Sequence, residues 1–236
     1  MLASRAETSA ADEARRRTES LTRIVVRPIG SPTALGLYGL ATGTLVLAGQ
    51  QLDWVGISEQ KSLGLLLIAF PFLTQLLASI WGFLARDAVA GTAMGLLALT
   101  WLSIGLVEFS SDPGSTSDAL GLLLLASATA MALTGLIASL SKIGVALVFI
   151  TASIRFALGA IHQLTGSAAW EDAAGIVGVV LFALAIYVAF AAELEDAQGR
   201  TVLPLGRRMR GSLAVVGSLE EQMKHAPNEA GVRQTL

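Results

Sequence analysis

The sequence contains no cysteine and only two histidines, His162 and His225. Without cysteine, the chain has neither disulfide bonds nor thiolate ligands for a metal ion. Only His162 lies in an apolar segment, so neither a two-histidine metal site nor a histidine-based catalytic triad can form there. These absences predict a protein that is not an enzyme, requires no cofactor and binds no metal.

Charged residues are scarce as well. They make up 14% of the 236 residues, whereas 53% are hydrophobic, and the mean hydropathy is +0.66. Soluble domains usually carry about 25% charged residues, so the composition predicts an integral membrane protein that is surrounded by lipid. The net charge of −2 gives no indication of a nucleic-acid partner. The initial stretch MLASRAETSAADEARRRTES lacks an apolar core, and we therefore expect no cleaved secretory signal.

Long apolar runs dominate what the sequence does contain. Each run is close to the roughly 20 residues that cross about 30 Å of hydrocarbon. Backbone polar groups in lipid have to be satisfied internally, so such runs predict α-helices. We expect an all-α protein with a six-helix transmembrane domain over 31–206, between a cytoplasmic tail over 1–30 and a mobile cytoplasmic tail over 207–236. The runs lie at about 33–51, 62–84, 88–108, 118–140, 143–164 and 173–192.

The connecting segments indicate the orientation of these helices. Fourteen lysines and arginines lie in the two tails and in the second and fourth loops, whereas the other loops contain only Lys61. Basic residues accumulate on the cytoplasmic side, so both termini are predicted to be cytoplasmic in a plasma-membrane protein. Residues 34–44 and 119–129 are identical at seven of eleven positions. Three runs separate the two copies, which suggests a 3+3 inverted repeat around a central pore, although Ala/Leu/Gly-rich helices also match by chance.

Arg155 is a permanent cation near the middle of the apolar stretch FITASIRFALGAIHQ (149–163). On a helix it shares one face with Thr151 and His162. An arginine at this depth costs about 2.5–3.5 kcal/mol on insertion scales and normally faces a cavity or a partner. The cores of the six runs contain no Asp or Glu, so no counter-ion is expected. Arg155 is either an anion site in an aqueous path or a structural residue that binds carbonyls freed at a kink such as Pro71 or points at a neighbouring subunit.

Several motifs resemble those of the acetate uptake transporters, the family of bacterial acetate/succinate permeases and their yeast relatives. SPTALGLYGL resembles the N-P-A-P-L-G-L signature, and FLTQLLASIWGF, TAMGLLALTW and AELEDAQGRTVLPLG continue the resemblance over about 30–207. Ser31 and Ala34 depart from the signature Asn and second Pro. The motif positions are Ser31, Pro32, Leu35, Gly36, Leu37, Glu193, Gly199, Arg200, Thr201 and Pro204.

The resemblance implies six helices per subunit, a pore within each subunit, a hexamer, and uptake of small monocarboxylates or succinate that is often proton-coupled. The family narrows its pore with two aromatic residues and a leucine, and the matching positions here are Leu40, Leu97 and Ala152. Arg155 lies one turn beyond Ala152, where the family is expected to be apolar. Pore positions that match the family are Gln75, Thr92 and Trp101.

Together these patterns predict transport of small organic anions such as acetate or succinate, by proton symport or through a channel. Arg155 would supply the positive potential for the anion. His162, about 10 Å further outward on the same helix, can titrate near neutral pH; it would attract the anion, carry a proton, or simply be hydrogen-bonded in a loop. The alternatives are a channel for neutral solutes such as urea, ammonia or glycerol, and a membrane scaffold that transports nothing.

Overall fold

The computed structural model describes residues 29–209 together with Asp12, Glu13, Arg16 and Ser212. Most of the two predicted tails, with His225, lies outside these residues. The described part is helical and contains no strand. Its elements are α2 (Thr33–Gln51), the short 3₁₀-helix η1 (Ile57–Glu59), α3 (Gln60–Leu67), the π-helical turn η2 (Ile68–Phe72), α4 (Leu73–Leu84), α5 (Ala88–Ser110), α6 (Asp118–Ala138), α7 (Ile143–Thr165) and α8 (Ala168–Gln198).

All six predicted runs are helical. Five stretches are long and apolar enough to cross a membrane, and they comprise Ile57–Leu84, α5, α6, α7 and α8. The first run, α2, is less apolar although it is 19 residues long. None of its residues is exposed, and twelve are buried. Most of its side chains therefore meet other helices, and threonine, glycine and glutamine are tolerated.

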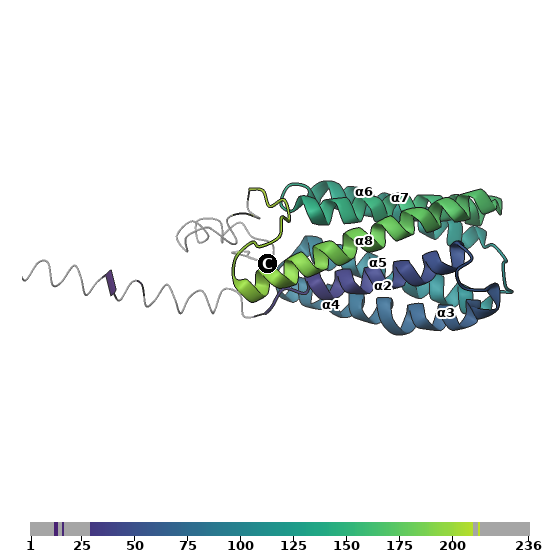
Figure 1. The fold of residues 1–236 in the computed structure, drawn as a ribbon, viewed down its shortest axis with the longest axis horizontal. Coiled ribbons are helices and arrows are strands. Elements are labelled where there is room, and N and C mark those ends of the chain that lie inside the picture. Colours follow the sequence, from purple (N-terminus) through teal and green to yellow (C-terminus); the bar gives the residue numbers. More distant parts are fainter. Residues whose placement is uncertain (1–11, 14–15, 17–28, 210–211, 213–236) are drawn as a thin grey trace, which may run out of the picture.

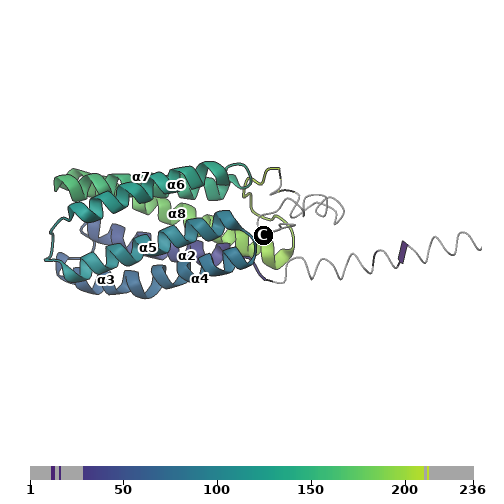
Figure 2. The same ribbon diagram turned by 180° about the vertical axis from the view of Figure 1, so that it is seen from behind.

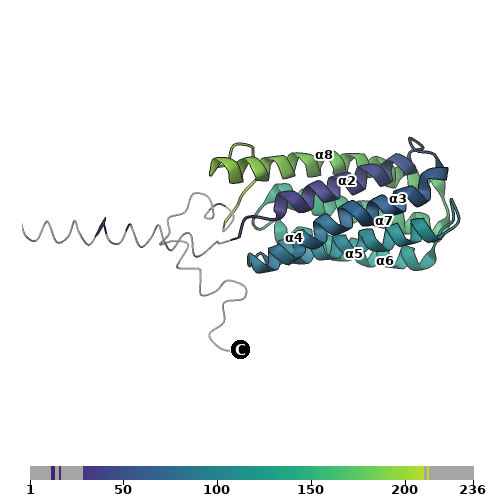
Figure 3. The same cartoon turned by 90° about the horizontal axis from the view of Figure 1, so that it is seen from below.

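The helices form an elongated bundle and run roughly along its long axis (Figure 1). α2 packs along α8, and α6 packs along α7. The view from behind shows α5 between the α6–α7 pair and the α3–α4 helix (Figure 2). The start of α2 and the end of α8 lie at the same end of the bundle (Figures 1 and 3). This placement agrees with an even number of crossings, whereas the inverted repeat stays a prediction.

The expected kink at Pro71 is present as the π-helical turn η2. Proline lacks the N–H that an α-helix uses, and a π-turn accommodates the extra residue. The Thr74 hydroxyl donates to the carbonyls of Phe70 (2.8 Å) and Pro71 (3.2 Å). The Pro71 ring lies so close to α2 that a Cβ on Gly43 would be 2.8 Å from it. Glycine at position 43 therefore allows the kink to pack against the central helix.

The motif after α8 folds back onto α7. The Gly206 carbonyl accepts from the Ile143 N–H (3.1 Å), and the Leu205 carbonyl accepts from the Gly144 N–H (3.0 Å). Both N–H groups belong to the first turn of α7, which has no partners within its own helix. The segment after α8 therefore caps α7 and holds the ends of the two helices together.

A buried carboxylate fastens this segment. Glu195 is buried and accepts hydrogen bonds from Thr201 Oγ1 (2.7 Å) and Arg207 Nε (2.9 Å). Glu193, the glutamate of the motif as aligned from the sequence, is exposed and accepts from the Tyr38 hydroxyl (2.8 Å). The structural link of the motif is thus made by Glu195, two residues further along the helix.

Candidate substrate pathway

Two cavities lie at opposite ends of the same four helices, α2, α5, α6 and α7. The Arg155 cavity is lined by Leu47 and Gln51, Ile104 and Glu108, Leu120 and Leu124, and Arg155, Phe156, Gly159, His162 and Gln163. Its volume is about 30 Å³, whereas one ordered water needs about 10–15 Å³. The Lys142 cavity measures about 70 Å³ and is lined by Thr33, Asp87, Val89, Ala90, Met94, Ala138, Ser141, Lys142, Val145 and Phe149.

An apolar barrier separates the cavities. Phe149 lines one cavity and Phe156 the other, and seven residues of α-helix span about 10 Å. Leu40, Leu97 and Ala152 lie within this barrier, are fully buried and belong to one hydrophobic core with Trp101. The three positions that the family resemblance assigned to a constriction are therefore packed together with no solvent access. The two cavities thus lie on either side of a closed apolar layer between the same four helices.

Arg155 lies at the barrier end of its cavity and is only 3% exposed. Its Nη2 donates to Gln51 Oε1 (3.2 Å), and its Cζ lies 5.8 Å from the centroid of the Trp101 ring. The aromatic face favours the cation by about 0.5–2 kcal/mol. The Arg155 Nε has no hydrogen-bond partner among the described residues. This guanidinium therefore keeps unused donor capacity in the interior of the bundle.

The structural alternative for Arg155, a contact with carbonyls at the Pro71 kink, is not what the structure contains. The Thr74 hydroxyl donates to two carbonyls of this turn, whereas the hydrogen bond of Arg155 goes to a side chain on α2. Trp101, which lies beneath the guanidinium, is itself held edge-on against Phe156 at 6.3 Å between ring centroids. Arg155 thus packs over the Trp101 ring at the edge of the barrier, and Phe156 packs against that ring.

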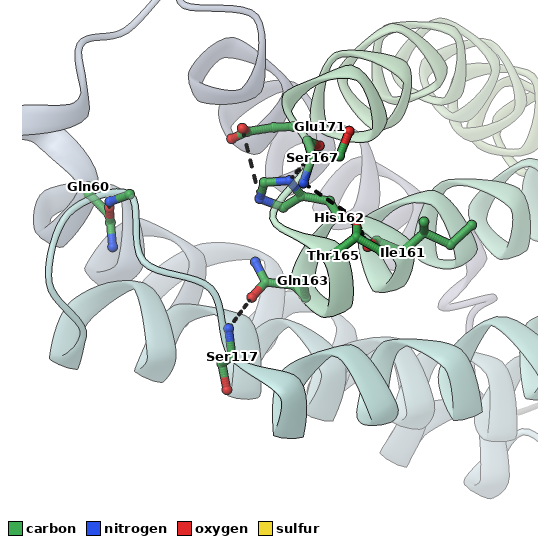
Figure 4. A network of polar contacts seen from close by, with 9 residues as sticks. Gln60, Ser117, Ile161, His162, Gln163, Thr165, Ser167 and Glu171 are labelled. Atoms are coloured by element: carbon green, nitrogen blue, oxygen red, sulfur yellow. Dashed lines mark hydrogen bonds and ion pairs between the residues drawn. The ribbon is translucent and has the colours of Figure 1, made fainter.

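His162 lines the same cavity and lies about two helical turns beyond Arg155 on α7. Its Nδ1 lies 3.1 Å from the Ser167 carbonyl, which requires a proton on Nδ1 if the contact is a hydrogen bond. Its Nε2 lies 3.8 Å from Glu171 Oε2 (Figure 4). The next residue, Gln163, accepts from the Ser117 N–H (2.7 Å). The ring is therefore fastened to the α7–α8 connection and also lines the cavity, and its role towards an anion or a proton stays a prediction.

Glu108 is the residue that the sequence analysis missed. It lies at the end of α5 and lines the Arg155 cavity. The sequence predicted no counter-ion for Arg155 within the cores of the apolar runs, and Glu108 shares its cavity from a helix end. Within the described part of the chain, no carboxylate comes within ion-pair distance of Arg155. The available signal was an acidic residue two positions before the end of an apolar helix.

Comparison with known proteins identifies the family of this chain. Residues 16–205 match the sequence model of the GPR1/FUN34/yaaH family. The chain belongs to this family. It is 28% identical to an uncharacterized protein of Methanothermobacter thermautotrophicus over 186 residues, 74% of this chain and 90% of that protein. It is 27% identical to the Saccharomyces cerevisiae ammonia transport outward protein 2 over 175 residues, 70% of this chain and 62% of that protein.

The bacterial relatives confirm the family resemblance found in the motifs. The chain is 44% identical to the Escherichia coli succinate-acetate/proton symporter SatP over 59 residues, which is 25% of this chain and 31% of SatP. It also matches the structure of the bacterial acetate channel SatP with a TM-score of 0.67 at 24% identity, over 75% of this chain and 99% of that one. This GPR1/FUN34/yaaH protein therefore has the SatP fold and is a multi-pass membrane protein.

The remaining predicted pore residues differ in how far they are buried. Gln75 is fully buried, and its Nε2 donates to the Gly36 carbonyl (3.2 Å) while its Oε1 has no partner among the described residues. Thr151 is half-buried and lines neither cavity. Thr92 is exposed, because two residues of α-helix rotate it about 200° away from the cavity-lining residue Met94. The structure does not bring Thr92 to the pathway.

Proposed function

We propose that this protein transports small organic anions, namely acetate, succinate or similar carboxylates, across the plasma membrane. The observation that carries the proposal is Arg155. It is a buried cation with spare hydrogen-bond donors, and it stands where a cavity meets an apolar barrier. An anion that approaches such a barrier loses its water, and a guanidinium can replace that water with charge-assisted hydrogen bonds. The names of the SatP relatives support this substrate class.

The barrier must open for transport, because Leu40, Leu97 and Ala152 leave no solvent-accessible passage between the cavities. We propose that these residues form the gate and that Arg155 presents the carboxylate to it. His162 lies nearer the mouth of the cavity, where it attracts the anion. Both proton symport and passive conduction are compatible with this arrangement.

A second candidate is transport of ammonia or another small neutral solute. One relative is named for ammonia transport, and an apolar barrier of about 10 Å suits a molecule without charge. In this alternative Arg155 repels ammonium and protons and binds no substrate. A scaffold without transport activity is the remaining alternative, and it predicts no flux of any solute.

A substrate panel in liposomes separates these candidates. The purified full-length protein is reconstituted, and uptake of labelled acetate, succinate, methylamine and urea is measured against protein-free liposomes. Carboxylate uptake above the protein-free background supports the proposal. Uptake of methylamine or urea without carboxylate uptake assigns the protein to the neutral solutes, and absence of all uptake in a folded protein favours the scaffold.

We further propose a ring of identical subunits, with six as the expected number, and cytoplasmic termini. Lys142 lies at the end of the bundle where α2 begins and α8 ends, which agrees with a basic cytoplasmic side. A C-terminal reporter that is active only outside the cytoplasm contradicts this orientation. A single 24.5 kDa subunit in native mass spectrometry from mild detergent contradicts the ring.

A further inference from the structure

Glu108 introduces a negative charge into the cavity that contains Arg155. It is half-buried on the last turn of α5, and α3 holds the backbone there through a hydrogen bond from Gln60 Nε2 to the Glu108 carbonyl (3.3 Å). Gln60 is itself fixed, because its Oε1 accepts from the Gly114 N–H (2.9 Å). The backbone at Glu108 is therefore held in place, and the residue lines the cavity of the proposed anion site.

The groups around Glu108 come from every helix that borders the cavity. α2 contributes the amides of Gln50 and Gln51, and α6 contributes only the apolar side chains of Leu120 and Leu124. α7 contributes Arg155, His162 and Gln163, and α8 contributes Glu171. Asp53 and Asp172 lie near Glu171. Arg155 and His162 are thus the only basic side chains that line this cavity with Glu108 among the described residues.

A carboxylate substrate and an ionised Glu108 repel each other in so small a space. The cavity volume is about 30 Å³, and Coulomb interactions are much stronger in a partly desolvated site than in water. With Glu108 ionised, the charges of Arg155 and Glu108 cancel, and an incoming anion leaves a net negative cavity. With Glu108 protonated, the charge of Arg155 is available to the anion.

We propose that Glu108 binds the proton that accompanies a carboxylate into this site. One proton adds to the Glu108 carboxylate when one anion binds beside Arg155, so the charge of the occupied cavity equals that of the empty one. The neutral carboxyl can also donate its O–H to the bound anion. When the anion leaves, the proton leaves with it and Glu108 returns to the ionised form. This inference rests on the proposed carboxylate transport and names its proton site.

His162 is less suited to this role. Its Nδ1 is engaged with the Ser167 carbonyl, and its Nε2 faces Glu171. A proton on His162 therefore forms an ion pair with Glu171, whose negative charge offsets it. That pair holds the proton away from the anion beside Arg155, whereas Glu108 lines the cavity and has no cation within ion-pair distance among the described residues.

The test measures proton uptake on substrate binding. The purified full-length protein in detergent and weak buffer receives acetate at matched pH, and the pH change is recorded. We expect wild type to take up about one proton per bound acetate. Glu108→Gln, which imitates the protonated acid, should bind acetate without taking up a proton. Glu108→Asp should take up protons as wild type does, and so should the control Asp112→Asn, whose side chain is exposed at the same end of the bundle.

Transport gives a second readout. In liposomes, wild-type acetate uptake above background should fall about tenfold per unit of rising external pH once Glu108 is ionised, and Glu108→Gln uptake should change less than about twofold over the same range. Wild type that binds acetate without proton uptake overturns the inference, whether or not the variant folds. Glu108→Gln that retains proton uptake, or that is folded and no longer binds acetate, also overturns it. Wild type that neither binds nor transports acetate at any pH refutes the proposed function instead.

Discussion

Gly178 on α8 makes room for the guanidinium of Arg155 on α7. A Cβ at Gly178 would lie 2.9 Å from Arg155 Nε and 3.0 Å from the Cβ of Ala48 on α2. Three helices therefore meet at one glycine, and the position of the buried cation depends on it. The absence of a side chain at residue 178 lets a charged group occupy space between helices that are otherwise closely packed.

The first prediction follows from this contact. Gly178→Ala should displace the guanidinium and reduce anion uptake by about tenfold. Overpacking a core typically costs about 1–3 kcal/mol of free energy, which the structure relieves by moving side chains and backbone. Uptake per folded protein in liposomes is the measurement. Gly49→Ala on α2 is the matched control, since a Cβ there would meet neighbours only at 3.7 and 3.8 Å. Equal uptake by wild type and Gly178→Ala would mean that transport does not depend on where Arg155 lies.

The second prediction concerns the charge itself. Arg155→Gln should remove most anion flux, by about 2–3 kcal/mol if one charge-assisted pair is lost, whereas Arg155→Lys should retain part of it because the charge remains while the planar fork is lost. Arg86→Gln, an exposed cation at the other end of the bundle, serves as control. If Arg155→Gln lowers only the melting temperature and leaves flux unchanged, the arginine is structural and the site assignment is wrong.

The third prediction concerns substrate size. The family resemblance implies bulkier residues at the positions of Leu40, Leu97 and Ala152, so the open gate should admit dicarboxylates or larger monocarboxylates in preference to acetate. Leu97→Tyr should shift the ratio of succinate to acetate uptake back towards acetate. Leu99→Tyr is the control, because Leu99 is 56% exposed on the same helix. An unchanged ratio in Leu97→Tyr would remove Leu97 from the gate.

The fourth prediction tests the link between α7 and α8. Arg207→Ala leaves the buried carboxylate of Glu195 without its cation, and breaking such a pair costs about 3–5 kcal/mol. The melting temperature in detergent should fall clearly. Replacing both Glu195 and Arg207 by leucine should restore part of the loss, because no unpaired charge remains. Arg208→Ala should have little effect, since Arg208 is exposed and contacts Ser141 through its backbone N–H; a drop equal to that of Arg207→Ala would contradict the assigned ion pair.

The sequence alone determined the helices, since an unbroken apolar run of about 20 residues can satisfy its own backbone in lipid as an α-helix. The predicted runs at 33–51 and 118–140 agree with α2 and α6 to within two residues, and the kink at Pro71 follows from a missing N–H. The family was also visible in contiguous motifs, whose residues are neighbours along the chain. Local chemistry decides all of these features, and local chemistry is what a sequence displays directly.

Only the tertiary structure decided which polar groups share a cavity. Helical periodicity places Arg155 and His162 on one face of α7, but it does not say that Glu108 of α5 faces them or that Thr92 turns away. It likewise does not distinguish the exposed Glu193 from the buried Glu195. Those outcomes depend on how each helix is rotated against its neighbours. That rotation is set by close contacts between residues far apart in the chain, such as Gly178 with Arg155 and Gly43 with Pro71.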